Sequence, residues 1–272
     1  MPPAGVGPWL VNLGFRPFLT QERLHFAVAS AGPVVWAHDL RERLPLDEAS
    51  CAAVYHSHVL EHFSRMEAPR LIEECRRVLK SGGVLRVAVP DLETIARLYL
   101  QSLDGALKAE AEAARRHEWL SLELLYQLVR EETGGDMRKS WNQKPIPARN
   151  FVVESMGRAC SSFIQAQRTH QPLPARRVRP ARKPTPAMIG KFREGGEVHK
   201  WMYDRWSLRC LLAGAGLDAI RVCAAGESGI PGFSRYHLDV DEDGNVRKPD
   251  SLCMEARKPG PPPVQLHTSL LT

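Results

Sequence analysis

The chain has 272 residues, of which 43% are hydrophobic and 25% charged, and its formal net charge is +6. This composition is typical of a globular protein with an ample core. No apolar run is long enough to cross a bilayer, and residues 1–5 lack the pattern of a signal peptide. Six scattered cysteines without a Cys-x-x-Cys pair indicate reduced thiols. We therefore expect a cytoplasmic protein without a membrane partner.

The positive charge is concentrated in one segment. Residues 168–193 hold eight lysines and arginines and no acid, which leaves a charge of −2 for the rest of the chain. Five prolines between positions 172 and 186 disfavour a regular helix or a central strand. We predict a basic, Pro-rich loop over residues 168–194. A nucleic-acid partner is not expected, because no Phe, Trp or Tyr lies between Arg168 and Lys183 to stack bases. Contact with a phosphate backbone stays open as an alternative.

The first half of the chain alternates short apolar strands with a helical pattern. Strands are expected near residues 9–14, 24–29, 34–37, 52–55 and 84–89, with an amphipathic helix before the last of them. This alternation predicts βαβ units and a parallel sheet. In such sheets ligands bind beyond the carboxyl ends of the strands. Asp39, His56, His58 and Asp91 all fall at expected strand ends.

The second half begins with a helical pattern that we interpret as an insertion. Residues 101–167 are expected to form a helical cap, and residues 259–272 a disordered tail. A helix beginning at Asp204 and strands near 217–223 and 252–256 complete the core. The predicted organisation is a core of residues 1–100 and 195–258, with the cap and the basic loop inserted between its two parts.

Several separated motifs resemble those of class I S-adenosylmethionine-dependent methyltransferases, of the predicted type 11 bacterial group. They are His38-Asp39-Leu40, the run from Tyr55 to His62, Arg77–Gly83, Val89–Glu93, Gly195–Arg205 and Arg247–Leu252. The resemblance implies an α/β, Rossmann-like sheet of seven strands, mostly parallel with the last strand antiparallel. It also implies S-adenosylmethionine as cofactor, and no metal.

Carried over to this chain, the resemblance places the methionine end of the cofactor against Asn12 and Gly14. Asp39 and Leu40 would lie beside the adenine, and the backbone of His56 and Ser57 would line the sulfonium end.

Three positions depart from the family pattern. Arg16 stands where a second glycine is expected after Gly14, Ala27 where an acid binds the ribose, and Ala52 where a further acid begins the fourth strand. Loss of the ribose carboxylate costs about 1.5–3 kcal/mol, or roughly 10- to 100-fold in affinity. Arg16 would repel the sulfonium by about 4 kcal/mol at ~4 Å unless it turns to solvent or pairs with the cofactor's carboxylate. Cofactor binding is weakened or lost if it does neither.

Histidines are the candidate catalytic residues. We expect His58 or His56 to act as a general base, while His62 is interpreted as a packed residue at a helix start. Besides Glu61, no cysteine or second carboxylate lies near them in sequence, so no metal site is predicted.

The acceptor is expected to contact four further residues: Asp91, His199, Tyr203 and Arg205. Two alternatives remain open for them. Asp91 equally suits a helix cap, and the other three equally suit a helix start with Trp201 and Trp206 in the core.

These observations lead to two functional hypotheses, with homodimer formation left open. The first is an enzyme that transfers a methyl group to a small-molecule acceptor. The second is a non-methylating relative that keeps the fold and uses the crevice for another ligand or a partner protein. A third, weaker hypothesis is RNA association through residues 168–193.

Overall fold

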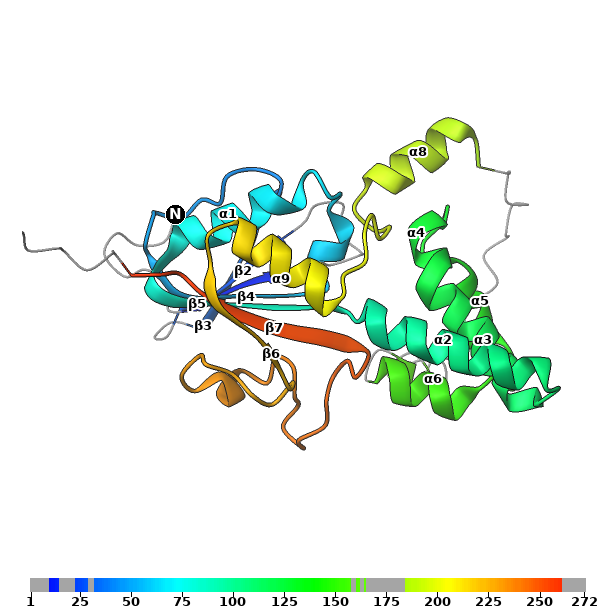
Figure 1. Cartoon of the computed structure of the whole chain (residues 1–272). Helices are drawn as coiled ribbons and strands as arrows, with labels where there is room; N and C mark the ends of the chain where they lie inside the picture. The colour runs from blue at the N-terminus through cyan, green and yellow to red at the C-terminus, as the bar shows by residue number, and fades with distance from the viewer. Residues whose placement is uncertain are drawn as a thin grey trace, which may run out of the picture.

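The computed structural model describes residues 10–14, 23–28, 32–157, 160, 161, 164 and 184–260. Its centre is a mixed sheet with the strand order β3-β2-β1-β4-β5-β7-β6 (Figure 1). The strands are β1 Leu10–Gly14, β2 Arg23–Val28, β3 Gly32–Ala37, β4 Cys51–Ser57, β5 Leu79–Pro90, β6 Asp218–Cys223 and β7 Ser251–Arg257. The order β3-β2-β1-β4-β5 is that of a Rossmann-like sheet, and the predicted α/β class is confirmed.

The strand directions differ from the expectation of a mostly parallel sheet. The central strands β1, β4 and β5 are parallel neighbours. The other neighbouring pairs are antiparallel, including both pairs made by β7, as expected for the last strand. The unexpected strand is β2. Only residues 15–22 join β1 to β2, whereas a parallel crossover needs about a dozen residues or more.

This reversal corrects the position of Ala27. The register pairs Ala27 with Leu10 and Arg23 with Gly14. Ala27 therefore lies at the edge of the sheet where β1 begins, not at the edge where β1 ends. It does not occupy the ribose position that the count along the sequence suggested. Ala52, in contrast, lies near the start of β4, as expected.

One face of the sheet is covered by α1 (Ala68–Val78) and α9 (Arg205–Gly214). Ser64 and Glu67 make the reciprocal bonds of a capping box before α1, at 2.9 and 3.3 Å. The helix then begins at Ala68 with Pro69 in its first turn, where proline is tolerated. Asp204 caps α9 through the backbone N–H groups of Trp206 and Ser207. Both helices bury their apolar faces in the main core of the protein.

The opposite face is covered by the segment that connects β6 to β7, with η3 (Phe233–Tyr236) in it. Arg86 on β5 holds this segment and is fully buried. Its guanidinium donates to Asp239 at 2.7 Å, to Glu255 at 3.0 Å, and to the carbonyl of Glu227 at 2.6 Å. It also lies over the ring of Phe233. Arg86 thus anchors this segment to the sheet through charged hydrogen bonds.

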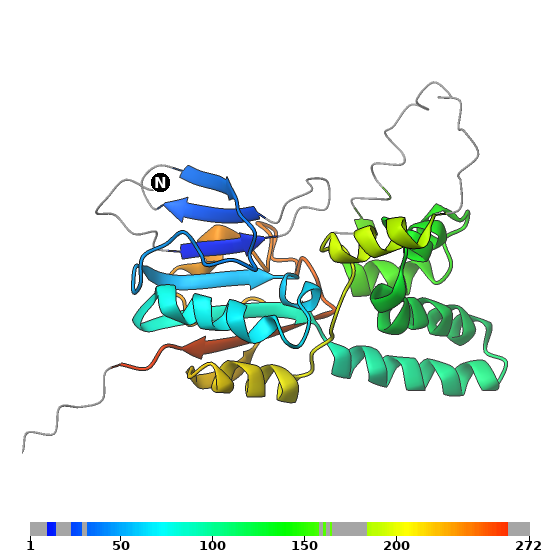
Figure 2. The same cartoon turned by 90° about the horizontal axis from the view of Figure 1, so that it is seen from above.

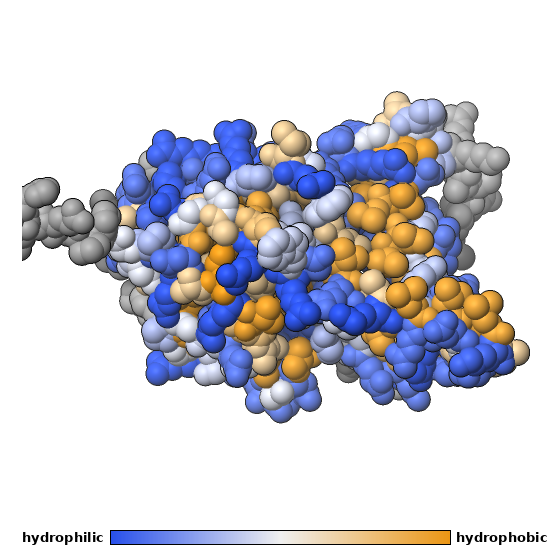
Figure 3. All heavy atoms as spheres, in the orientation of Figure 1, coloured by the Kyte–Doolittle hydropathy of each residue, from blue (hydrophilic) through white to orange (hydrophobic). Residues whose placement is uncertain are grey.

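Beyond the carboxyl end of β5, a helical unit lies beside the sheet (Figure 2). Its elements are α2 Leu92–Leu107, α3 Ala111–Ser121, η2 Leu122–Tyr126, α4 Gln127–Val129, α5 Gly135–Asn142, α6 Arg149–Met156 and α8 Pro186–Glu194. Figure 3 shows apolar surface over this unit. Its exposed large apolar residues are Leu100, Leu107, Leu125, Val129 and Met188.

Helix α8 differs from the predicted basic loop. Thr185 caps it by accepting from the N–H of Met188, and Pro186 occupies the first helical position, where its fixed φ favours a helix. Residues 168–183 of that loop and residues 261–272 of the predicted tail lie outside the described residues. Among the described residues, no helix has both the length and the apolar character needed to cross a membrane.

The Arg86 anchor is predicted to dominate the stability of the β6–β7 segment. Replacing Arg86 with Leu leaves Asp239 buried without its cation and Glu255 paired with Arg221 alone, which costs about 3–5 kcal/mol in the free energy of unfolding. Arg221→Leu is the matched control, because Arg221 also pairs with Glu255 but its side chain is 51% exposed. That change should cost less than about 1 kcal/mol. Urea unfolding measures both, and equal losses would contradict this role of Arg86.

Glu123 predicts a pH-dependent stability of the helical unit. Burial, followed by the charge of Asp250, raises the pKa of this carboxyl to about 8. Hydrogen bonds from Trp119 and Ser155 lower the pKa but do not offset that rise. The stabilising contribution of Glu123 is complete below about pH 4.5 and is lost as the pH rises through 8. The difference in free energy of unfolding between Glu123→Gln and wild type should therefore shift in favour of the variant by on the order of 1–3 kcal/mol from pH 5 to pH 8.5.

Urea unfolding at the two pH values measures this gain. Glu112→Gln, at an exposed position of α3, is the control and should show no such gain. Identical pH dependence in wild type and Glu123→Gln would rule out the raised pKa.

Candidate functional site

Several strand ends meet at one edge of the sheet. Gly14 at the end of β1 pairs with Arg23, which pairs with Ala37 at the end of β3. Leu13 pairs with His56 near the end of β4. The expectation that the chain near positions 14, 39 and 56 lies along one edge is therefore confirmed at the level of the backbone.

A cavity of about 420 Å³ opens beside this edge, where β4 and β5 end. Ser57, His58 and Pro90 form its floor, and residues of the helical unit form its opposite wall. Lys248 and Asp250, which precede β7, complete it. A cavity of this size suits a small molecule.

His58 occupies a strained position at the floor of the cavity. It follows β4 with φ +54°, in the left-handed region that a residue with a Cβ seldom adopts. Its Nε2 lies 2.8 Å from Ser251 Oγ, and its Nδ1 lies 3.2 Å from a carboxylate oxygen of Glu61. Burial, followed by the charge of Lys248, lowers the pKa of His58 to about 3. The imidazole is therefore neutral near pH 7.

Glu61 connects the cavity to a distant part of the chain. It belongs to η1 (Leu60–His62) and is fully buried. Its carbonyl accepts from the N–H groups of Lys200 and Trp201, at 2.7 and 3.2 Å. These bonds fix the segment before α9 against η1. They place His199 beside His62, with ring centroids 5.0 Å apart.

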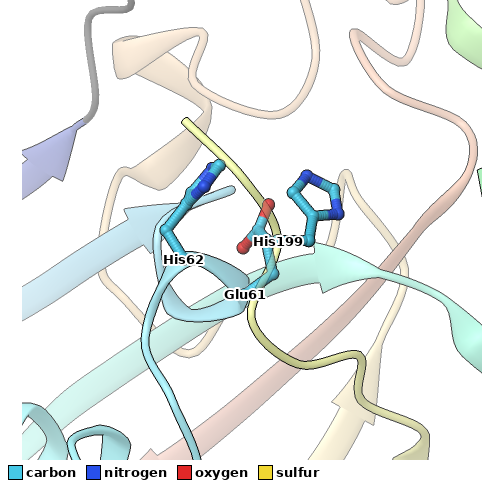
Figure 4. A group of neighbouring side chains, drawn as sticks. All are labelled: Glu61, His62 and His199. Carbon is cyan, nitrogen blue, oxygen red and sulfur yellow. The ribbon is translucent and has the colours of Figure 1, made fainter. Parts of the chain in front are cut away.

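The two imidazoles and the Glu61 carboxylate form a compact group. One ligand atom from each of the three residues lies within 4.8 Å of the others, and all three residues line the cavity. Figure 4 shows their side chains together. Burial lowers the pKa of His199 to about 3 and also lowers the pKa of His62. Both rings are therefore neutral near pH 7.

The cavity wall carries both signs of charge. Arg130 lies 3.5 Å from Glu197, and Lys248 and Asp250 face the cavity from the other side. Burial lowers the pKa of Lys248 and raises the pKa of Asp250. This lining suits a polar ligand rather than a hydrocarbon.

Those residues expected to bind the cofactor that the structure describes lie near this edge. Asn12 and Gly14 belong to β1, Ser57 lines the cavity, and Arg16 lies outside the described residues. Asp39 forms an ion pair with Arg41 at 2.6 Å. The side chain of Leu40 is buried in the main core, so it faces away from any ligand.

His56 does not reach the cavity. It is fully buried and aligns with Val87, which belongs to the main core. Burial lowers the pKa of its imidazole to about 4. Of the two candidate general bases, the structure thus brings His58 into the cavity and leaves His56 in the sheet.

Of the four residues expected to contact the acceptor, only His199 lines the cavity. Asp91 caps α2 by accepting from the N–H groups of Glu93 and Thr94, and Tyr203 is buried in the core. Arg205 is exposed and forms an ion pair with Glu93 at 2.8 Å. The structure therefore gives Asp91 the cap role that the sequence left open.

Sequence reasoning did not select Glu61, Glu123, Arg130, Glu197, Lys248 or Asp250, which also line the cavity. Four of them had a usable signal, because Glu61, Glu197, Lys248 and Asp250 lie within motifs that carry the family resemblance. The residues of the helical unit had none, because their position depends on how that unit folds over the edge.

Residues 19–87 match the family model described as a methyltransferase domain. This range covers β2 to β4 and most of β5, and it includes Ser57, His58, Glu61 and His62. No curated protein matches the chain.

Three solved structures are similar to the chain. A chain from the complex between the Trm112 methyltransferase activator and the putative methyltransferase of Haloferax volcanii has 14% identity and a TM-score of 0.32, covering 82% of this chain and 60% of that one. A possible histamine N-methyltransferase from Thermotoga maritima has 11% identity and a TM-score of 0.30, covering 81% and 61%. A putative methyltransferase from Bacillus halodurans has 14% identity and a TM-score of 0.28, covering 82% and 76%.

The match therefore spans about three fifths of the length of the first two proteins. The matched range includes the cavity residues Ser57, His58, Glu61 and His62. The resemblance of this chain to the class I S-adenosylmethionine-dependent methyltransferases is therefore confirmed over residues 19–87.

Proposed function

We propose that the protein transfers a methyl group from S-adenosylmethionine to a small, polar acceptor. The observation that carries this proposal is the 420 Å³ cavity at the ends of β4 and β5, beside the edge where β1 and β3 also end. Ligands of Rossmann-like sheets bind at this edge. The edge suits the cofactor, and the adjoining cavity suits an acceptor of limited size.

The described residues fit the cofactor at the end of β3. His38 Nε2 is buried and makes no hydrogen bond within the described part of the chain, so a polar ligand there would satisfy it. Asp39 follows directly, and its carboxylate is a hydrogen-bond acceptor. Asn12, Gly14 and Ser57 would complete the site, and Leu40 and His56, whose side chains are buried, would contribute backbone groups only. The bound cofactor supplies a methyl group on a sulfonium.

The chain's own residues would orient the acceptor. Lys248 and Arg130 suit its anionic groups and Glu197 and Asp250 its cationic groups. His58 lines the cavity beside Glu61 and would accept the proton of a hydroxyl or amine, as a weak base because its pKa is lowered to about 3. The helical unit would act as a cap that excludes water and aligns the acceptor with the methyl group. The six cysteines are free thiols, which supports a cytoplasmic location.

One observation favours the alternative, a relative that does not methylate. Between β1 and β2 lie only eight residues, 15–22, and β2 is antiparallel. In Rossmann-like folds a glycine-rich turn after the first strand leads into a helix whose N-terminus binds the ligand. The antiparallel pairing of β2 with β1 departs from this parallel strand–helix–strand arrangement. Such a protein would use the cavity for a different ligand.

Calorimetry with S-adenosylmethionine and its demethylated product separates the two functions. We expect binding with a Kd below about 1 mM. Asp39→Ala should weaken it by about 10- to 100-fold, the effect of one hydrogen bond to a charged group. Glu42→Ala is the matched control, because Glu42 is an exposed acid of the same turn. Its affinity should stay within about twofold of wild type.

Absence of heat from the wild-type protein at millimolar cofactor would exclude methyl transfer and leave the alternative. Binding that Asp39→Ala does not alter would show that the cofactor lies elsewhere than at the end of β3.

A further inference from the structure

We propose that Glu61, His62 and His199 form a binding site for a divalent transition-metal cation of the Zn²⁺ class. One ligand atom from each lies within 4.8 Å of the others, and the three side chains point into a common space (Figure 4). Two imidazole nitrogens and one carboxylate oxygen are a ligand set that binds Zn²⁺ in proteins. The site itself does not depend on the proposed function.

The Glu61 carboxylate is the strongest argument for a cation. The residue is fully buried, and neither carboxylate oxygen makes a hydrogen bond within the described residues. His58 Nδ1 approaches one oxygen to 3.2 Å without forming such a bond. A buried polar group without a hydrogen-bond partner costs about 1–3 kcal/mol, and more when it carries a charge. A metal cation between this carboxylate and the two imidazoles would remove that cost.

The imidazoles are prepared for the same role. His199 Nδ1 is buried and makes no hydrogen bond within the described part of the chain. His62 Nδ1 donates to the carbonyl of Val198 at 3.3 Å, so the lone pair of the neutral ring lies on Nε2. Fixing the second ring nitrogen through a backbone carbonyl is the usual way in which proteins orient a metal-binding histidine.

The backbone holds the three ligands in place before any metal binds. The bonds from Lys200 and Trp201 to the Glu61 carbonyl join the two chain segments that carry the ligands. A tetrahedral cation with bonds of ~2.1 Å requires ligand atoms about 3.4 Å apart. Side-chain rotations that shorten these separations by up to about 1.4 Å would complete the site.

Lys248 is the rival source of positive charge. It lines the same cavity, and its charge interacts with that of Glu61. Among the described residues, however, no hydrogen bond or ion pair of Glu61 with Lys248 satisfies the carboxylate. A lysine also leaves the His199 nitrogen without a partner, whereas a metal cation satisfies both groups at once.

Three protein ligands leave a coordination position open, as in catalytic rather than structural zinc sites. All three ligands line the 420 Å³ cavity, so the open position would face it. A water molecule or an acceptor hydroxyl bound there would lose its proton more readily. This last role, activation of the acceptor, rests on the proposed function.

Metal titration of the untagged, full-length protein after chelator treatment tests the site. We expect Co²⁺ to produce visible absorption bands at one equivalent, and Zn²⁺ to abolish them. Glu61→Gln and His199→Gln should each weaken Zn²⁺ binding by at least about 100-fold, more than the loss of an outer partner causes. Glu123→Gln is the control, because it changes a buried carboxylate of the same cavity outside the group. Its affinity should equal that of wild type.

No bands with the wild-type protein, or equal affinity in all variants, would overturn the site. If Glu61→Gln does not fold, His199→Gln and the shift of the wild-type thermal midpoint with Zn²⁺ decide in its place. The metal site would also be overturned if Lys248→Met lost Zn²⁺ binding while Glu61→Gln kept the affinity of wild type. Cofactor calorimetry on the metal-free protein separates the two proposals: metal uptake without cofactor binding contradicts only the proposed function, and the reverse result contradicts only the metal site.

Discussion

The site depends on a single residue that acts through two different groups. The carbonyl of Glu61 binds the backbone of Lys200 and Trp201, and its carboxylate faces the cavity between two histidines. The first contact joins the end of β4 to a segment that follows the whole helical unit in sequence. The second places a buried carboxyl group beside two imidazoles at the cavity. Because one residue makes both contacts, the geometry of the cavity and its electrostatics are linked.

Much of the core was predictable because local signals and burial agree there. The Ser64–Glu67 capping box, Pro69 and the apolar positions Leu71, Ile72 and Cys75 indicate α1, and the structure confirms them. Asp204 as a cap and the strand before the C-terminal tail were readable in the same way. The end of β4 was identified as a ligand edge because polar residues follow an apolar run there.

The errors have physical causes that the sequence pattern does not contain. Apolar runs mark strands without marking their direction, so β2 was assigned parallel although its connection is too short. Thr185 and Pro186 begin a helix inside the segment 168–194, for which the prolines predicted a loop. His199 meets His62 through the main-chain bonds to Glu61 and the bond from His62 to the Val198 carbonyl, so the three-residue group could not be recognised from spacing along the chain.

The central claim is that the edge formed by β3, β1 and β4 binds an adenosyl cofactor whose reactive end points to the cavity. A crystal structure of the protein with S-adenosylhomocysteine tests it most directly. The account predicts density along this edge, with adenine near Asp39 and the sulfur atom near Ser57. Density in any other place, or an empty edge at saturating ligand, would contradict it.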